Sequence, residues 1–318
     1  MLMTTLAAQE RVAFVFPGQG SQYVGMGKSL YEASEAARQV FQQADQVLGF
    51  ALTKLMFEGP DSELEDTINA QPAILTLSVA CLAVLREKWS ELGKAAQPIF
   101  VAGHSLGEYS ALVAAEVLDF ADALTLVRER GRLMKETSEE RPGGMAAVVG
   151  LQRETLETIV SEAGERGLIV IANTNTADQM VISGELSALD RAVELCREAK
   201  ARAVVPLRIS IASHSPLMQE AAMRLAEIIA ALQLRDPVTP MVANIQGRIL
   251  TTAEDIRQHM ATQLTLPVEW TQSVRGMIES GVDTFVEIGP GQVLSRLIRK
   301  ISRDVRAMAL SDSELSKL

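Results

Sequence analysis

The chain has 318 residues, 47% of them hydrophobic, which is enough for one large domain with a smaller domain inserted in it. A net charge of -10 argues against a nucleic-acid partner, and no signal peptide or apolar run of membrane-spanning length is evident, so we expect a cytoplasmic protein. The two cysteines, Cys81 and Cys196, show neither pairing nor metal-ligand spacing, which predicts a reducing compartment and no metal site.

The first predicted strand, residues 11–16, runs into a glycine-rich loop at 17–22 and then a helix to about Val47. This order is typical of nucleotide binding, but the fingerprints fail. Tyr23 stands where a dinucleotide motif needs its last glycine, and Gln22 stands where a P-loop needs its first. Parallel strands end at one edge of a sheet, where ligands bind, so the loop is instead expected to line a pocket there.

Two helices are predicted next. Ser62 and Glu65 have the spacing of a capping box that opens a short helix. Pro72 is expected to begin a long apolar helix to about Leu92, and its composition predicts packing in the core.

Residues 98–109, PIFVAGHSLGEY, have the order of a nucleophile elbow. A buried strand is predicted at 99–102, the G-x-S-x-G pattern follows at 103–107, and a helix is predicted at 106–116. The turn would expose the hydroxyl of Ser105 at a helix N-terminus, where free N–H groups and the helix dipole stabilise negative charge on an attacked carbonyl. Ser105 is therefore a candidate nucleophile, and the alternative is an ordinary glycine-rich turn.

Asp119 is expected to cap a helix from Phe120 to about Lys135. Arg130 lies in the apolar stripe of that helix, where an unpaired charge is very costly, so it needs an anionic partner. That partner is either a carboxylate of the core or a carboxylate of the substrate, and the residues alone do not separate the two.

Residues 141–144, RPGG, are expected to mark the boundary between the large domain and an inserted subdomain. The predicted order beyond it is that of a ferredoxin-like unit, with strands at 145–149, 168–172, 179–183 and 203–207, and helices at 153–165 and 186–200. We expect a subdomain over residues 141–206, inserted in a large α/β domain of residues 1–140 and 207–318. Further strands of the large sheet are predicted at 241–244 and 284–288, the second followed by a C-terminal helix.

A serine of ordinary pKa needs a general base, and the chain has three histidines. His104 adjoins Ser105, so its ring should point away from the hydroxyl and line the pocket. His259 lies in a polar helical stretch and is expected at the surface. His214 follows an apolar run and precedes a helix started by Pro216, which makes it our choice of base. No aspartate stands in an obvious triad position, so a backbone carbonyl is a possible third member.

Together these segments resemble the malonyl-CoA:acyl carrier protein transacylase family and the related polyketide synthase acyltransferase domains. The resemblance extends from about Val12 to Leu310. The segments that carry it are FPGQGSQ at 16–22, GHSLGE at 103–108, RG at 130–131, GMA at 144–146, 173–184, SH at 213–214, PVEW at 267–270 and EIGPG at 287–291.

The resemblance implies an α/β-hydrolase-like core with a parallel sheet and a ferredoxin-like subdomain. It implies that Ser105 is acylated, that His214 is its base, and that the backbone N–H groups of Gln19 and Leu106 form the oxyanion hole. Arg130 would bind the malonyl carboxylate, and a carbonyl near Gln263 would orient His214. His104 and Gln263 would then belong to the substrate-binding site.

The reaction implied is ping-pong. Malonyl-CoA acylates the serine, and the phosphopantetheine thiol of acyl carrier protein takes the malonyl group, in fatty acid or polyketide synthesis. The resemblance implies a monomer without a tightly bound cofactor. Residues 211–214, IASH, lack the aromatic residue usual before this histidine in malonyl-selective polyketide enzymes, so methylmalonyl stays an alternative extender. Two further hypotheses stay open, a thioester hydrolase that uses the same serine and a non-catalytic subunit that docks the carrier.

A basic stripe is predicted on the C-terminal helix, where Arg296, Arg299, Lys300 and Arg303 fall on one face. Carrier proteins of these pathways are acidic, so this face is a candidate docking surface. The alternative is a solvated face that complements the helix C-terminus.

Overall fold

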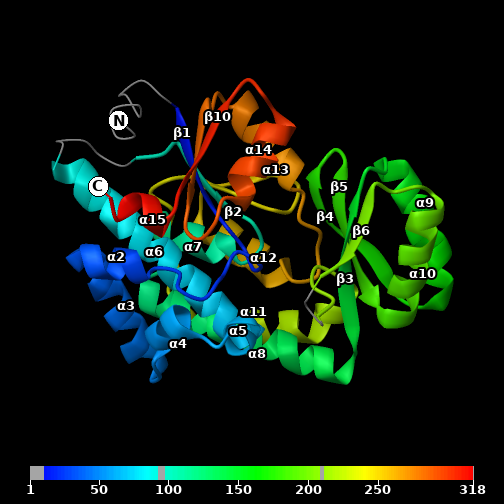
Figure 1. The fold of residues 1–318 in the computed structure, drawn as a ribbon, viewed down its shortest axis with the longest axis horizontal. Helices are drawn as coiled ribbons and strands as arrows, with labels where there is room; N and C mark the ends of the chain where they lie inside the picture. The colour runs from blue at the N-terminus through cyan, green and yellow to red at the C-terminus, as the bar shows by residue number, and fades with distance from the viewer. Residues whose placement is uncertain (1–10, 92–96, 208–210, 318) are drawn as a thin grey trace.

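The computed structural model describes residues 11–91, 97–207 and 211–317. The N-terminal residues used to judge a signal peptide, and the start of the apolar run before His214, lie outside these ranges. Most of the chain forms one six-stranded sheet with helices on both faces, and residues 143–206 supply a second, four-stranded sheet beside it (Figure 1).

The large sheet has the strand order β10-β9-β1-β2-β7-β8. Its strands are β1 (Val12–Phe16), β2 (Phe100–Gly103), β7 (Met241–Val242), β8 (Ile249–Leu250), β9 (Thr284–Ile288) and β10 (Arg306–Leu310). All neighbours pair in parallel except β8, which runs antiparallel to β7. The parallel α/β core is thus confirmed, but the short edge strands β8 and β10 were not predicted.

Alternation along the strands divides the core between the two faces of this sheet. Phe14 and Phe16 face a large cluster formed with α2 (Lys28–Ala33), α3 (Glu35–Leu48), α4 (Leu52–Glu58), α5 (Asp61–Glu65), α6 (Thr67–Glu91), α7 (Gly107–Ala114), α8 (Phe120–Glu140), α11 (Gln219–Ala231), α12 (Ala253–Thr262) and α15 (Asp312–Leu315). Ala13 and Val15 face a smaller cluster with α13 (Trp270–Glu279) and α14 (Val293–Ile301).

The expectation that no apolar run reaches membrane-spanning length was wrong for α6. This helix is long and apolar enough to cross a bilayer, but 83% of its most apolar window is buried inside the protein. It is therefore a core helix, as its packing against α3 and α8 requires. Pro72 lies inside α6 and does not begin it, since the helix already starts at Thr67.

One predicted cap is wrong, and the other is correct in position but lacks the side-chain hydrogen bond. Helix α5 begins at Asp61 after Pro60 and has no side-chain cap, so Ser62 does not open a capping box. Asp119 does hold the N-cap position of α8, but its carboxylate accepts a hydrogen bond from Arg235 and none from the helix. Helix α8 also runs five residues further than predicted, to Glu140, and Thr137 is the buried residue of this polar extension.

The second sheet has the antiparallel order β4-β5-β3-β6 of a ferredoxin-like unit, as predicted. Its elements are β3 (Gly143–Val149), α9 (Arg153–Ala163), η1 (Gly164–Arg166), β4 (Ile169–Thr176), β5 (Gln179–Glu185), α10 (Leu186–Glu198) and β6 (Ala203–Pro206). Helices α9 and α10 cover the face that points away from the large sheet (Figure 1).

The small sheet is also hydrogen-bonded to the segment that precedes α13 in the large domain. Asn173 of β4 forms a parallel bridge with Val268, with hydrogen bonds of 2.8 Å from Thr174 N to Val268 O and from Val268 N to Ala172 O. This joint leaves the uncovered face of the small sheet beside the ends of β1 and β2.

Candidate active site

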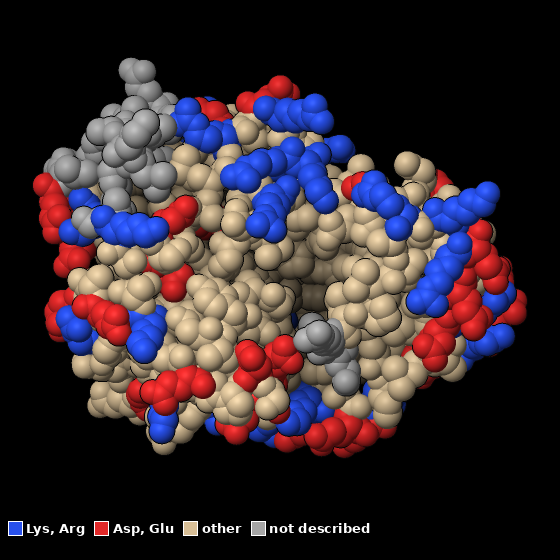
Figure 2. Space-filling view, viewed as in Figure 1, with Lys and Arg blue, Asp and Glu red and all other residues tan. Residues whose placement is uncertain are grey.

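Ser105 lies on a sharp turn between β2 and α7, as the elbow motif predicts. Its backbone has φ 50°, a left-handed conformation that is unusual for a residue with a side chain. Two glycines make the turn possible. A Cβ on Gly103 would lie 1.9 Å from the carbonyl carbon of Gly107, and a Cβ on Gly107 would lie 2.0 Å from the oxygen of Phe16. The turn presents Ser105 to a cavity of about 270 Å³ at the hollow between the two sheets (Figure 2).

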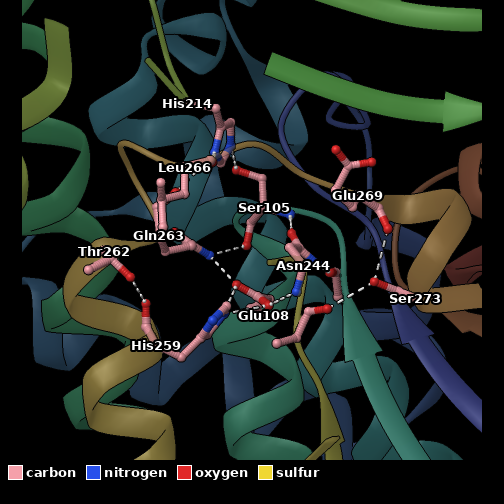
Figure 3. Close-up of polar contacts among 12 residues, drawn as sticks. Ser105, Glu108, His214, Asn244, His259, Thr262, Gln263, Leu266, Glu269 and Ser273 are labelled. Carbon is pink, nitrogen blue, oxygen red and sulfur yellow. Dashed lines mark hydrogen bonds and ion pairs between the residues drawn. The ribbon is translucent and has the colours of Figure 1, made fainter. Parts of the chain in front are cut away.

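His214 is the histidine that meets the serine. Its Nε2 lies 2.8 Å from Ser105 Oγ, and its Nδ1 lies 3.0 Å from the carbonyl oxygens of Gln263 and Leu266 (Figure 3). Carbonyl oxygens only accept, so Nδ1 carries the proton and Nε2 is free to accept from the serine hydroxyl. Carbonyls therefore occupy the place of the missing triad carboxylate. The residues between Ser215 and α11 form the short helix η2 (Pro216–Met218).

The environment keeps this imidazole neutral. Burial, the positive charge of Arg130 and a smaller contribution from His104 lower the pKa of His214 to about 4, although the two carbonyls act in the opposite direction. A neutral imidazole is the form that can take a proton.

The other histidines have different surroundings. His104 lines the cavity, with Nε2 2.8 Å from Asn175 Oδ1, and burial lowers its pKa. The expectation that His259 lies at the surface was wrong. It is 7% exposed and its Nε2 lies 2.9 Å from Glu108 Oε1. Ile256 and Met260 flank it on one buried stripe of α12, a helical spacing that the polar composition concealed.

Arg130 is 1% exposed and points to the serine. Its Nη1 donates to Gln71 Oε1 at 2.8 Å, and its Nη2 donates to Gln263 Oε1 at 3.2 Å and to Ser105 Oγ at 3.3 Å. Among the described residues no carboxylate forms an ion pair with it, so the structure does not supply the core partner considered above. Gln71 was missed, although a glutamine just before Pro72 in an apolar run was a usable signal.

The glycine-rich loop after β1 lies against the elbow. A Cβ on Gly18 would lie 2.4 Å from the oxygen of His104, so only glycine allows this approach. Gln19 and Leu106 both line the cavity, and the described part of the chain supplies no hydrogen-bond acceptor for either backbone N–H. The side chain of Gln19 accepts from Thr67 Oγ1 at 3.1 Å, which helps to fix the loop.

The remaining walls of the cavity are largely apolar. Met145, Ala147 and Val181 come from the uncovered face of the small sheet, and Leu294 and Leu297 come from α14. Among the described residues, no group of three or more His, Cys, Asp or Glu side chains could bind a metal ion.

The predicted basic stripe is only partly correct. Arg296, Arg299 and Lys300 are exposed on α14, but the helix ends at Ile301, so Arg303 lies beyond it and does not extend the stripe. Arg299 also donates from Nε and Nη2 to the oxygen of Ala307. Basic side chains gather above the hollow in Figure 2, and α14 itself lines the cavity.

A serine on an elbow turn, hydrogen-bonded to a buried histidine at the edge of a parallel α/β sheet, defines the class of serine-dependent acyltransferases and hydrolases. Residues 13–313 match the family model of the acyl transferase domain. The chain is 44% identical over 309 residues to a malonyl CoA-acyl carrier protein transacylase of Bacillus subtilis, covering 97% of this chain and 96% of that protein.

Solved structures of malonyltransferases have the same fold as this chain. An acyl carrier protein S-malonyltransferase from Vibrio cholerae superposes with a TM-score of 0.90 at 39% identity, covering 97% of this chain and 99% of that one. A malonyl-transacylase in complex with its type II PKS acyl-carrier protein superposes with a TM-score of 0.91 at 40% identity, covering 96% and 98%. The chain therefore belongs to the malonyl CoA-acyl carrier protein transacylase family, which confirms the resemblance seen in the sequence.

Proposed function

We propose that the protein transfers a malonyl group from CoA to the phosphopantetheine thiol of an acyl carrier protein through a malonyl ester on Ser105. One observation carries the choice of acyl group. Arg130 is buried, has no carboxylate partner among the described residues, and lies 3.3 Å from the serine oxygen. A guanidinium in that place favours an acyl group that brings its own carboxylate, which it can hold with two hydrogen bonds.

In the first transfer, Ser105 Oγ gives its proton to His214 Nε2 and attacks the thioester carbonyl. The backbone N–H groups of Gln19 and Leu106 stabilise the oxyanion. The C–S bond then breaks, and His214 returns the proton to the departing CoA sulfur. In the second transfer, the phosphopantetheine thiol gives its proton to His214, its sulfur attacks the ester carbonyl, and the serine oxygen leaves with that proton.

Partners and setting follow from the same proposal. Malonyl-CoA and an acyl carrier protein are the substrates, and no tightly bound cofactor is needed because acyl transfer involves no oxidation. We assign the protein a monomeric state and a cytoplasmic location, and the carrier serves either fatty acid or polyketide synthesis.

Replacing Arg130 with alanine tests the choice of acyl group. We expect kcat/KM for malonyl-CoA to fall on the order of 10² to 10³, since removing one partner of a buried charged pair costs roughly 2–5 kcal/mol. Acetyl-CoA should become comparatively better, because it no longer leaves a buried charge unpaired. The measurement is kcat/KM for malonyl-, methylmalonyl- and acetyl-CoA, with thermal unfolding alongside.

The control is Arg130→Lys, which keeps the charge but loses the planar fork. We expect it to retain the preference for malonyl over acetyl at a reduced rate. An unchanged malonyl-to-acetyl ratio in the alanine variant would mean that the carboxylate is recognised elsewhere. Equal use of malonyl- and methylmalonyl-CoA by the native protein would favour the broader extender specificity.

The docking role of α14 is tested by charge reversal at Arg296 and Lys300, which are exposed. Arg299 is exposed too, but it is left unchanged because its guanidinium donates to the oxygen of Ala307. The double variant to glutamate should raise the KM for an acidic carrier about tenfold at low salt and leave acylation by malonyl-CoA unchanged. The matched control is the same reversal at Arg197 and Lys200 beside the far face of the small sheet. Equal KM values in both variants would contradict the docking role.

A further inference from the structure

Glu108 is a buried charged residue that takes no part in the reaction steps above. It lies in the first turn of α7, three residues after Ser105, and its side chain is fully buried. It is not among the residues that line the cavity. A buried carboxylate is unfavourable unless its oxygens are well hydrogen-bonded, so its partners indicate what it does.

Three residues converge on this carboxylate (Figure 3). Oε1 accepts from the backbone N–H of Asn244 at 2.7 Å, and His259 Nε2 lies 2.9 and 3.0 Å from the two oxygens. Gln263 Nε2 donates to Oε2 at 2.5 Å. Burial alone would raise the pKa of Glu108, but the interaction with His259 and the hydrogen bonds of Gln263 and Asn244 outweigh it and lower the pKa. The group is therefore a carboxylate at neutral pH.

The contact with Gln263 fixes which way its amide points. A carboxylate can only accept, so it draws Nε2 toward itself, and Oε1 must then face the opposite side. There Oε1 accepts from Arg130 Nη2 at 3.2 Å, while Nε2 also donates to Ser105 O at 2.9 Å. The main-chain oxygen of the same residue accepts from His214 Nδ1. One glutamine thus contacts the nucleophile's backbone, the base and the arginine.

The contact with Asn244 supports the strained turn. Its Oδ1 accepts from the backbone N–H of Ser105 at 2.6 Å, and its Nδ2 donates to the oxygen of Gly103. Asn244 therefore bonds both sides of the elbow, and its own backbone is held by Glu108.

The contact with His259 holds the end of α12. His259 and Gln263 are four residues apart and lie on one face of α12 at its C-terminal end, so the Glu108 carboxylate is hydrogen-bonded to both side chains. The segment that follows carries the two carbonyls, at Gln263 and Leu266, that hold His214.

We propose that Glu108, which is hydrogen-bonded to His259, is a positioning residue. It acts through Gln263 and Asn244, and it fixes the relative positions of Ser105, His214 and Arg130. It supplies the orienting carboxylate that the dyad lacks, but it acts on an amide and on carbonyl-bearing backbone, and not on the imidazole itself. The inference rests on the roles proposed above for those three residues.

The test is single-turnover acylation by malonyl-CoA, with rate constants expressed per active site and the modified residue mapped by peptide mass spectrometry. Glu108→Gln should lower the acylation rate constant about 10- to 100-fold, since a small misplacement of reacting groups has that effect. The dissociation constant for malonyl-CoA should change less than threefold, because Arg130 keeps its 2.8 Å bond to Gln71. Asp312→Asn is the control, because Asp312 is a buried carboxylate that bonds Tyr23 and Gly27 outside the cavity.

A second pair of variants covers the case in which Glu108→Gln does not fold. His259→Gln keeps an N–H donor for the carboxylate and should stay within threefold of the native rate constant, whereas His259→Ala should fall about tenfold. Two outcomes would contradict the proposal and leave Glu108 with a structural role only. One is equal acylation rate constants in the two His259 variants. The other is a decrease of the rate constant in Glu108→Gln that is no larger than in Asp312→Asn. Mapping the native adduct to Ser105 in the same assay separates that outcome from a failure of the proposed function.

Discussion

Replacing Ser105 with alanine is expected to abolish the malonyl-enzyme adduct and to lower transfer to the carrier on the order of 10⁶-fold, the effect of removing a serine nucleophile. No other described hydroxyl or thiol is hydrogen-bonded to His214 Nε2. Both cysteines are buried, and burial raises the pKa of each thiol. The measurement is intact mass after mixing with malonyl-CoA, together with carrier malonylation.

The alanine variant should fold. Alanine meets the same backbone strain at φ 50° as serine, and the side chain loses only its bonds to His214 and Arg130. Circular dichroism and thermal unfolding provide the check. An adduct that persists on another residue of a folded variant would contradict the assignment of Ser105.

Replacing His214 with alanine is the second large effect. Acylation should slow by about 10² to 10⁴, the usual contribution of a positioned general base. His104 and His259 cannot substitute, since their rings are bonded to Asn175 and Glu108. Acylation rates of both proteins are measured by CoA release in a single turnover. A larger loss in His259→Ala than in His214→Ala would show that the wrong base was chosen.

The pH profile is part of the same test. The proposed base, His214, would act when its imidazole is neutral. Its pKa is lowered to about 4, so the native acylation rate should stay constant down to pH 5 and fall as the pH approaches 4. The same shift affects stability. The unfolded chain binds the His214 proton at a higher pH than the folded protein does, so this histidine lowers stability as the pH falls below the ordinary imidazole value. The ellipticity measured at each pH separates acid unfolding of the protein from protonation of His214. The pH profile of the acylation rate of His214→Ala should lack the decrease near pH 4.

Much of the site follows from local sequence. The elbow needs small residues at 103 and 107, a strand before them and a helix after them. All of these features can be recognised in the local sequence at residues 98–109. The placement of Arg130 follows from helical spacing, because a charge in an apolar stripe must be buried when that stripe packs. The order of the small sheet follows from its alternating elements.

Other parts depend on contacts between distant segments. Asn244 meets the elbow across 139 residues and His259 meets Glu108 across 151 residues, so neither short-range pattern nor composition reveals them. A polar residue at the end of a parallel strand was the available hint for Asn244. The two-residue strand β8 has too short a pattern to predict, and its pairing depends on β7.

The backbone at the dyad has a consequence for the stability of the whole protein. Ser105 and His214 both have left-handed backbone angles, φ 50° and 56°, which only glycine adopts without strain. Each such residue costs on the order of 1–3 kcal/mol, against a typical domain stability of about 5–15 kcal/mol. Glycine would relieve the strain at either position, but it would also remove the hydroxyl of Ser105 or the imidazole of His214. The two residues of the proposed dyad therefore lower the stability of the folded protein, and the rest of the structure has to compensate for that strain.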